Sequence, residues 1–241
     1  MIGFVGGKRG DAQSAGLHNI YRAFRDGSKC DSYAKDAFGP EFTCHPHGWG
    51  FAFYDGGRLH HFRSSLPAWQ EEVPLPPIQG RNVYAIFHSR LASDPTLNSP
   101  ICSHPFLAAT DKEVLLLAHN GEVEVADPSA SLVIDSEWAL AAIVRAGGIE
   151  MALPELKERT RPNSALNLLV LAIPRDGKNP PAIHCLNFYK TDEPGRVAYY
   201  KMYTADLAGG KVVLSSTFKD LAIKGLTNIK PAPFDQLFSF F

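Results

Sequence analysis

The chain opens with Met1-Ile2-Gly3-Phe4-Val5-Gly6-Gly7, a run of apolar, aromatic and β-branched residues that stops at two glycines. Such a run predicts a buried strand, and its burial would hold the start of the chain inside the fold. The run is also too short, before Lys8 and Arg9, to form the hydrophobic region of a secretory signal. We therefore expect a cytoplasmic protein.

The chain length predicts one large domain or two small ones, and the absence of a linker rich in Pro, Gly or Ser favours a single domain over residues 1–241. Hydrophobic residues make up 45% of the chain and charged residues 20%, and 24 Lys and Arg against 25 Asp and Glu leave a net charge of −1. This balance provides no basic stripe for nucleic acid. The longest apolar runs are far shorter than the ~20 residues that span a bilayer, so no membrane contact is expected. The four cysteines have no C-x-x-C spacing and are expected to be reduced.

Hydrophobic periodicity outward from the first strand predicts strands with helices gathered in two clusters. Leu17, Ile20, Tyr21 and Phe24 mark one face of a helix over 11–25. Helices are also predicted over 137–146, capped by Asp135 or Ser136, and over 151–157. Strands joined by turns at 55–57 and 119–122 are predicted over 49–54, 58–62, 83–87, 113–118, 166–173, 183–189, 197–204 and 211–216. Because the strands do not alternate with helices, this pattern favours an α+β fold.

Four residues have both a structural and a functional interpretation. Asn120-Gly121 is typical of a tight turn, but an Asn side chain and a Gly N–H can also form an oxyanion hole. Arg90 follows a predicted strand and can pair with a surface carboxylate or bind a substrate carboxylate with two hydrogen bonds. Asp135 can cap a helix or bind a substrate ammonium. Each of these signals alone favours the structural interpretation.

Other chemistries lack the spacing that they require. His45 and His47 lie close to Cys44, and His60 adjoins His61, but no second pair completes the ligand set of a zinc site. The chain has no G-x-S-x-G motif for a serine nucleophile and no G-x-x-x-x-G-K-[ST] motif for a phosphate loop. We therefore expect neither a metal nor a cofactor.

Six short motifs together resemble a class II glutamine amidotransferase domain, the N-terminal-nucleophile hydrolase domain found in asparagine synthetase and amidophosphoribosyltransferase. The nearer likeness is to the small stand-alone members of this family. Six motifs in the right order and spacing are far more specific than any single one. They are Met1-Ile2-Gly3-Phe4-Val5-Gly6, His47-Gly48-Trp49-Gly50-Phe51-Ala52-Phe53-Tyr54, His88-Ser89-Arg90-Leu91-Ala92-Ser93, Ser103-His104-Pro105-Phe106, His119-Asn120-Gly121 and Asp135-Ser136-Glu137.

The resemblance implies a four-layer αββα sandwich and a role for each candidate residue. Arg90 would hold the α-carboxylate of glutamine and Asp135 its α-ammonium, while Asn120 and Gly121 would form the oxyanion hole for the side-chain amide. This assignment is chemically coherent, because a zwitterion needs one cation and one anion, and a developing oxyanion needs neutral donors. Two more residues are expected to support the pocket: Trp49 and His104.

The nucleophile position departs from the family pattern. The resemblance implies that family members carry a cysteine directly after the initiator Met. Removal of that Met makes the cysteine the first residue, and its own α-amine then acts as the general base. Here that position is Ile2, which has no nucleophile, and a bulky second residue also disfavours Met removal. Cys30, Cys44, Cys102 and Cys185 lie inside the chain, without an α-amine beside them. We therefore expect a possible pseudoenzyme that binds glutamine or a γ-glutamyl compound without hydrolysing it.

Two alternatives are open at this point. The protein could be an active amidohydrolase that uses another nucleophile, or a metal-bound water near Cys44, His45 and His47. The native product could instead carry Cys at position 2, which intact mass and N-terminal sequencing would reveal. The expected partners are a glutamine-like small molecule and a separate synthase subunit that would use ammonia.

Overall fold

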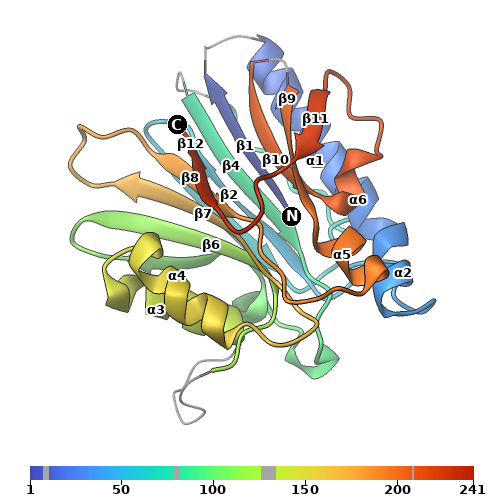
Figure 1. The fold of residues 1–241 in the computed structure, drawn as a ribbon. Helices are drawn as coiled ribbons and strands as arrows, with labels where there is room; N and C mark the ends of the chain where they lie inside the picture. The colour runs from blue at the N-terminus through green and yellow to red at the C-terminus, as the bar shows by residue number, and fades with distance from the viewer. Residues whose placement is uncertain (8–10, 79–81, 126–133, 208) are drawn as a thin grey trace.

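The computed structural model describes residues 1–7, 11–78, 82–125, 134–207 and 209–241, in which two antiparallel sheets lie between helices (Figure 1). Within these residues one sheet has seven strands, in the order β11 (Thr227–Pro231), β9 (Met202–Leu207), β10 (Gly210–Ser215), β1 (Ile2–Gly7), β4 (Asn82–Ser89), β2 (Trp49–Tyr54) and β3 (Leu59–Ser64). The other sheet has five strands, in the order β12 (Leu237–Phe240), β8 (Ala182–Leu186), β7 (Leu166–Pro174), β6 (Glu113–Gly121) and β5 (Phe106–Ala109).

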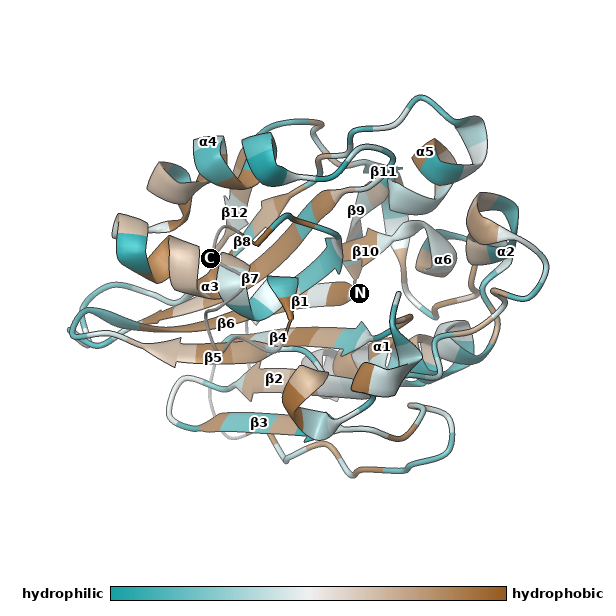
Figure 2. Ribbon diagram, turned by 90° about the horizontal axis from the view of Figure 1, so that it is seen from below, coloured by the Kyte–Doolittle hydropathy of each residue, from teal (hydrophilic) through white to brown (hydrophobic). Residues whose placement is uncertain are grey.

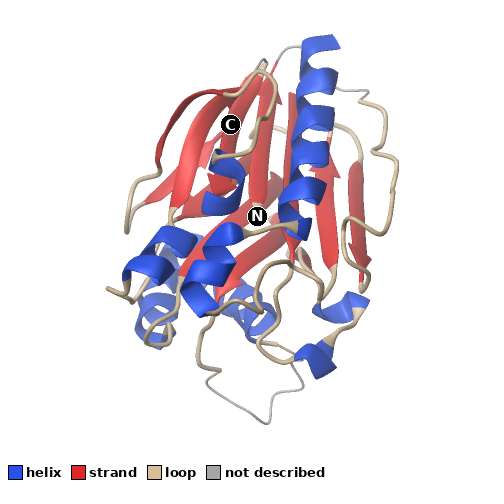
Figure 3. Ribbon diagram, turned by 90° about the vertical axis from the view of Figure 1, so that its right-hand side faces the viewer, coloured by secondary structure: helices blue, strands red, loops and turns tan. Residues whose placement is uncertain are grey.

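Three helices, α1, α3 and α4, cover the outer faces of the two sheets, as Figure 3 shows for the long helix α1, whereas α2 and α5 pack on each other. The α-helices are α1 (Asp11–Lys29), α2 (Ser32–Phe38), α3 (Asp135–Ala146), α4 (Ile149–Arg159), α5 (Pro194–Tyr200) and α6 (Ser216–Lys219). Two 3-10 helices, η1 (Pro95–Leu97) and η2 (Pro100–Cys102), lie between β4 and β5. No helix in the described ranges is long and apolar enough to cross a membrane.

Three apolar clusters join these elements into four layers. One cluster packs α1 against the seven-stranded sheet, a second packs α3 and α4 against the five-stranded sheet, and a third fills the space between the sheets. Figure 2 shows the hydrophobic stretches along the strands in brown. The order helix, sheet, sheet, helix confirms the expected αββα sandwich.

Strand β1 belongs to two of these clusters at once. Ile2 and Phe4 pack with the α1 side of the sheet, while Val5 packs between the sheets. Gly3 faces the second sheet so closely that a Cβ there would lie 3.3 Å from Leu169. Because both faces of the strand are buried, the apolar run at the start of the sequence contains no charged residue.

Three local predictions are wrong. The strand predicted over 197–204 is helix α5 up to Tyr200, and β9 begins at Met202, because Pro194 starts a helix that packs on α2. The turn predicted over 119–122 does not form, since β6 continues through Gly121 and pairs with β7. Helix α1 extends past Gly27 to Lys29, and the elements α2, α5, α6, β5, β11 and β12 were not predicted.

We predict that Leu169→Ala destabilises the fold by about 2–5 kcal/mol, because it leaves a cavity between the sheets. Leu169 is fully buried on β7 and contacts the β1 backbone at Gly3. Met151→Ala is the control, since Met151 is 72% exposed on α4 and its truncation leaves no cavity. Urea unfolding checks this expectation, and equal midpoints for the two variants would contradict it.

Candidate functional site

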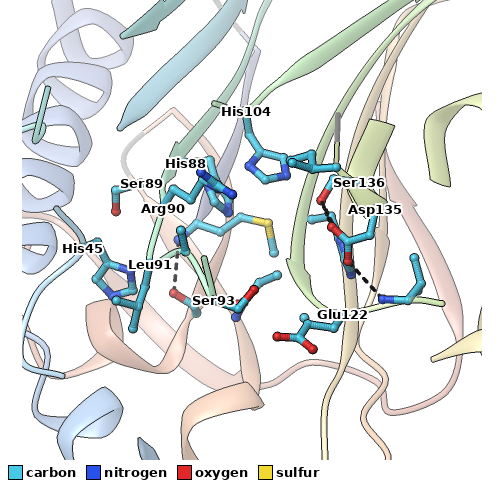
Figure 4. Close-up of a pocket in the computed structure, with 18 of the residues that line it drawn as sticks. His45, His88, Ser89, Arg90, Leu91, Ser93, His104, Glu122, Asp135 and Ser136 are labelled. Atoms are coloured by element: carbon cyan, nitrogen blue, oxygen red, sulfur yellow. Dashed lines mark hydrogen bonds between the residues drawn. The ribbon is translucent and has the colours of Figure 1, made fainter. Parts of the chain in front are cut away.

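One cavity of about 430 Å³ lies where the ends of several elements meet. Its walls come from the start of β1, the ends of β4, β6 and β10, the start of α3, and α5 and α6. In Figure 4, His45, Ser89 and Leu91 lie on one side of the cavity, and Asp135 and Ser136 lie across from them. Elements distant in sequence thus supply a single concave surface.

Arg90 directly follows β4 and is 92% shielded from solvent, with 8% of its surface exposed. Its Nη1 donates to the Leu97 carbonyl at 2.8 Å, and its backbone N–H donates to the Gly48 carbonyl. Burial lowers the pKa of the guanidinium, while the Cys102 thiol and the Asp135 carboxylate oppose that shift. Arg90 is therefore a held, buried cation that lines the same cavity as Asp135.

Asp135 is the first residue of α3, not its cap. The cap position is Ile134, which makes no side-chain cap bond. The Asp135 carboxylate instead accepts hydrogen bonds from the Val123 N–H at 3.0 Å and from the Ser136 hydroxyl at 3.3 Å. The helical position is still favourable for an anion, because the amino end of a helix carries partial positive charge. The cap predicted at Asp135 or Ser136 is thus wrong.

Asn120 and Gly121 end strand β6 and line the cavity. The Asn120 side chain is hydrogen-bonded to Tyr199, whose pKa burial raises well above its ordinary value. Gly121 has φ of +132°, and a Cβ there would lie 1.8 Å from the Ala165 carbonyl oxygen. The strand therefore requires glycine at 121, both for its backbone conformation and for its close contact with the neighbouring chain segment.

Three buried histidines form part of the cavity wall. The rings of His88 and His104 lie 4.1 Å apart between centroids, and His119 Nδ1 is hydrogen-bonded to Ser136 Oγ at 3.0 Å. Burial lowers the pKa of each of the three rings; neighbouring positive or imidazole groups add to this shift at His88 and His104, whereas the Asp135 carboxylate opposes it at His119. Among the described residues, neither ring nitrogen of His104 has a hydrogen-bond partner. These imidazoles are neutral at neutral pH.

The start of β1 brings Met1, not Ile2, to the cavity. Ile2 is fully buried toward α1, whereas Met1 lines the cavity and its α-amine donates to Ser215 Oγ at 3.3 Å. Burial lowers the pKa of this amine to about 5, although the Asp31 carboxylate raises it. Successive side chains of a strand point to opposite faces, so residues 1 and 2 cannot both face the cavity.

Of the other residues that the sequence predicts for the site, some line the cavity and others do not. His45 and His104 line the cavity, whereas Trp49 is buried in the cluster beneath α1, with its indole N–H donating to Glu71. No group of three His, Cys, Asp or Glu side chains that could hold a metal ion gathers within the part of the chain that is described. Sequence reasoning did not single out these cavity residues: Tyr199, Ser215 and Thr217. They are far along the chain and carry no motif.

A family model identifies the family of the chain, and solved structures show its fold. The family model described as "Glutamine amidotransferases class-II" matches residues 32–179, more than half of the chain. The chain belongs to the class II glutamine amidotransferases. The matched range includes Arg90, Asn120, Gly121 and Asp135, and it begins after Ile2. No curated protein matches the sequence.

Two solved structures of similar fold are about twice as long as this glutamine amidotransferase chain. The glutamine phosphoribosylpyrophosphate amidotransferase of B. subtilis, complexed with ADP and GMP, matches at TM-score 0.55 and 14% identity over 99% of this chain and 48% of its own. An allosteric regulatory enzyme of purine biosynthesis matches at TM-score 0.59 and 14% identity over 97% of this chain and 45% of its own. The chain therefore spans about half the length of these structures, and the likeness at this identity establishes the fold.

We predict that Gly121→Ala destabilises the protein far more than Gly147→Ala. Both glycines have positive φ, but nothing lies within 4 Å of a Cβ built at Gly147. Gly147→Ala should cost about 1–3 kcal/mol from backbone strain alone. Gly121→Ala adds the overlap with Ala165, so we expect a loss above about 4 kcal/mol or no folded protein. Equal losses in denaturant unfolding would refute the close contact.

We also predict that acid destabilises the fold through His88 and His104. Burial holds the pKa of both rings well below 6.5, so the unfolded chain binds more protons than the native protein below about pH 6.5. Stability should fall with pH by up to about 1.4 kcal/mol per unit for each ring. His104→Gln should reduce this slope between pH 5 and 6.5 in urea unfolding, whereas His60→Gln, on β3 outside the cavity wall, should keep it. An unchanged slope for His104→Gln would disprove this role.

Proposed function

We propose that this class II glutamine amidotransferase binds glutamine or a γ-glutamyl compound in the cavity. The observation that carries the proposal is that Arg90 after β4, Asn120 and Gly121 at the end of β6, and Asp135 at the start of α3 line one concave surface. A cation, an anion and two neutral donors form a set that complements an amino acid with a side-chain amide. One cation and one anion are enough to pair with the two charges of that ligand.

The proposed ligand contacts follow from charge. Arg90 binds the α-carboxylate, since only one of its five N–H donors is used by the bond to Leu97. Asp135 binds the α-ammonium, because its two oxygens accept one bond each from Val123 and Ser136, and a carboxylate offers about four acceptor sites.

Asn120 and Gly121 would bind the amide oxygen. The Asn120 side chain carries two N–H donors, and its bond with Tyr199 holds the amide in place at the end of β6. The residue at 121 must be glycine for the strand to run this close to Ala165, which leaves the backbone N–H uncovered by a side chain. These two groups therefore form the proposed oxyanion hole.

In this proposal no thiolate acts at the start of the chain. Ile2 carries no nucleophile and its side chain is buried away from the cavity, while Met1 carries a thioether. The protein is therefore proposed as a glutamine-binding member of the family that lacks the N-terminal cysteine reaction. Its proposed macromolecular partner is a separate synthase subunit.

Isothermal titration with glutamine tests the binding proposal. Arg90→Gln and Asp135→Asn should each weaken binding about 10–100-fold, because each removes a charge-assisted contact worth about 1.5–3 kcal/mol. Arg58→Ala is the matched control, since Arg58 is exposed in the β2–β3 turn. Intact mass and N-terminal sequencing of the sample verify residue 2. No binding heat at millimolar glutamine would disprove the proposal.

A further inference from the structure

Two backbone hydrogen bonds join the end of α1 to the segment that follows α2. The Asp31 N–H donates to the Thr43 carbonyl at 2.8 Å, and the His45 N–H donates to the Ser28 carbonyl at 2.8 Å. Because Asp31 meets Thr43 and Ser28 meets His45, the two segments run antiparallel, as neighbouring strands of a hairpin do. The junction of α1 and α2 is therefore fastened to the chain that leads into β2.

These hydrogen bonds place Cys30 beside Cys44. Between the two bonds, one segment holds Lys29 and Cys30 and the other holds Cys44 alone, which is the two-against-one arrangement of a β-bulge. Cys30 and Cys44 also flank the same bond, since one precedes its donor Asp31 and the other follows its acceptor Thr43. Facing residues of antiparallel segments have Cα atoms about 4.5–5.5 Å apart. A disulfide needs about 4.4–6.8 Å, so the register suits a bridge.

The two thiols lie on the outer side of the paired segments. The side chains of Asp31 and His45 are buried and hydrogen-bonded to each other at 2.7 Å. Successive side chains of an extended segment point to opposite sides, so the adjoining Cys30 and Cys44 point away from the interior. Cys30 is exposed, Cys44 is half-buried, and both are free thiols in this structure. A dissolved oxidant can therefore reach the pair.

The other two cysteines lack this arrangement. Cys102 ends η2 and Cys185 lies on β8, and both side chains are buried. Burial raises the pKa of the Cys102 thiol and raises the pKa of the Cys185 thiol well above its ordinary value. Since the thiolate is the reactive form, both react slowly with disulfides. The chain thus contains its own control cysteines.

We propose that Cys30 and Cys44 form a reversible disulfide by exchange with a small-molecule disulfide such as glutathione disulfide. The thiolate of one cysteine attacks a sulfur of that molecule, which forms a mixed disulfide and releases one thiolate. The other cysteine attacks the protein-bound sulfur, forms the Cys30–Cys44 bond and releases the second thiolate. The cysteines are oxidised, the small disulfide is reduced, and the two cysteine protons pass through solvent to the two released thiols.

The bridge fastens a part of the cavity wall. It closes a loop over residues 30–44, which contains Asp31 and all of α2. The Asp31 carboxylate accepts from Thr217 and is hydrogen-bonded to His45, and both of these residues line the cavity. A disulfide restricts the unfolded chain and thereby favours the folded state. The redox state of the pair therefore sets how firmly this side of the cavity is held.

Tryptic mapping of the native protein tests the bridge. The protein is incubated with glutathione disulfide, its free thiols are blocked with iodoacetamide, and it is cleaved without reduction. Cleavage after Lys29, Lys35 and Arg58 puts the two cysteines on the separate peptides 30–35 and 36–58. These peptides stay together only through a disulfide. We expect the joined peptides, an intact mass lower by two hydrogens, and separation of the peptides by dithiothreitol.

Single variants provide the matched controls. Cys30→Ser and Cys44→Ser should each stop at a mixed disulfide with glutathione on the remaining cysteine, because the second attack has no thiolate to make it. Cys102→Ala should form the bridge as the natural sequence does. A Cys102→Ala variant that no longer forms the bridge would contradict the assigned pairing.

The folded state should favour the bridge. By linkage, a disulfide that stabilises the native fold is stabilised by that fold to the same extent. We expect the equilibrium constant for bridge formation to be about 10–100-fold larger in the native protein than in urea. Hydrogen exchange of the Asp31 and His45 amides, which donate the two bonds, should be slower in the oxidised protein than in the reduced protein.

Three outcomes would overturn the proposal. Glutathione on both Cys30 and Cys44 without the joined peptides would show that the thiols do not meet in the native fold. A disulfide-linked dimer on a non-reducing gel would show that the exposed Cys30 pairs between copies of the chain. Equal equilibrium constants in native buffer and in urea would show that the fold does not position the pair.

Discussion

Strand β1 is buried on both faces, and the positions of the other layers depend on this burial. Ile2 and Phe4 face the layer of α1, whereas Gly3 approaches Leu169 of the opposite sheet. Glycine at this point lets the two sheets pack closely around the strand. Because β1 lies in the centre of its sheet, the start of the chain is held beside the ends of β4 and β10. The cavity forms at that junction.

The cavity combines fixed charges with neutral imidazoles. Arg90 and Asp135 are each held by hydrogen bonds to neighbouring segments, so little reorganisation is needed when a charged ligand enters. His88 and His104 stay uncharged because burial disfavours the imidazolium form. The field inside the cavity is therefore set by a few oriented groups.

Some elements of the fold and the site could be predicted, because a short stretch of sequence carries the pattern that specifies each of them. The apolar run of β1, the Asp55-Gly56-Gly57 turn between β2 and β3, and the helix from residue 137 all carry their own pattern. Other predictions failed because contacts with segments distant in sequence decide the local structure. The Asn120-Gly121 pair is typical of a hairpin turn, yet it continues β6 because pairing with β7 stabilises the extended backbone. Residues near Tyr200 have strand composition but form α5, which packs on α2.

The sequence by itself determined the family and the identity of the candidate groups, because the six motifs carry those residues in a fixed order. It also determined that isoleucine stands at position 2. Only the tertiary structure decided which side chains share one cavity, since Met1, Asp135 and Ser215 are separated by large stretches of chain. It also decided that the Asp31 carboxylate is hydrogen-bonded to the His45 ring. Neither residue carries a sequence signal for the other, because backbone hydrogen bonds from Asp31 to Thr43 and from His45 to Ser28 bring the two segments together.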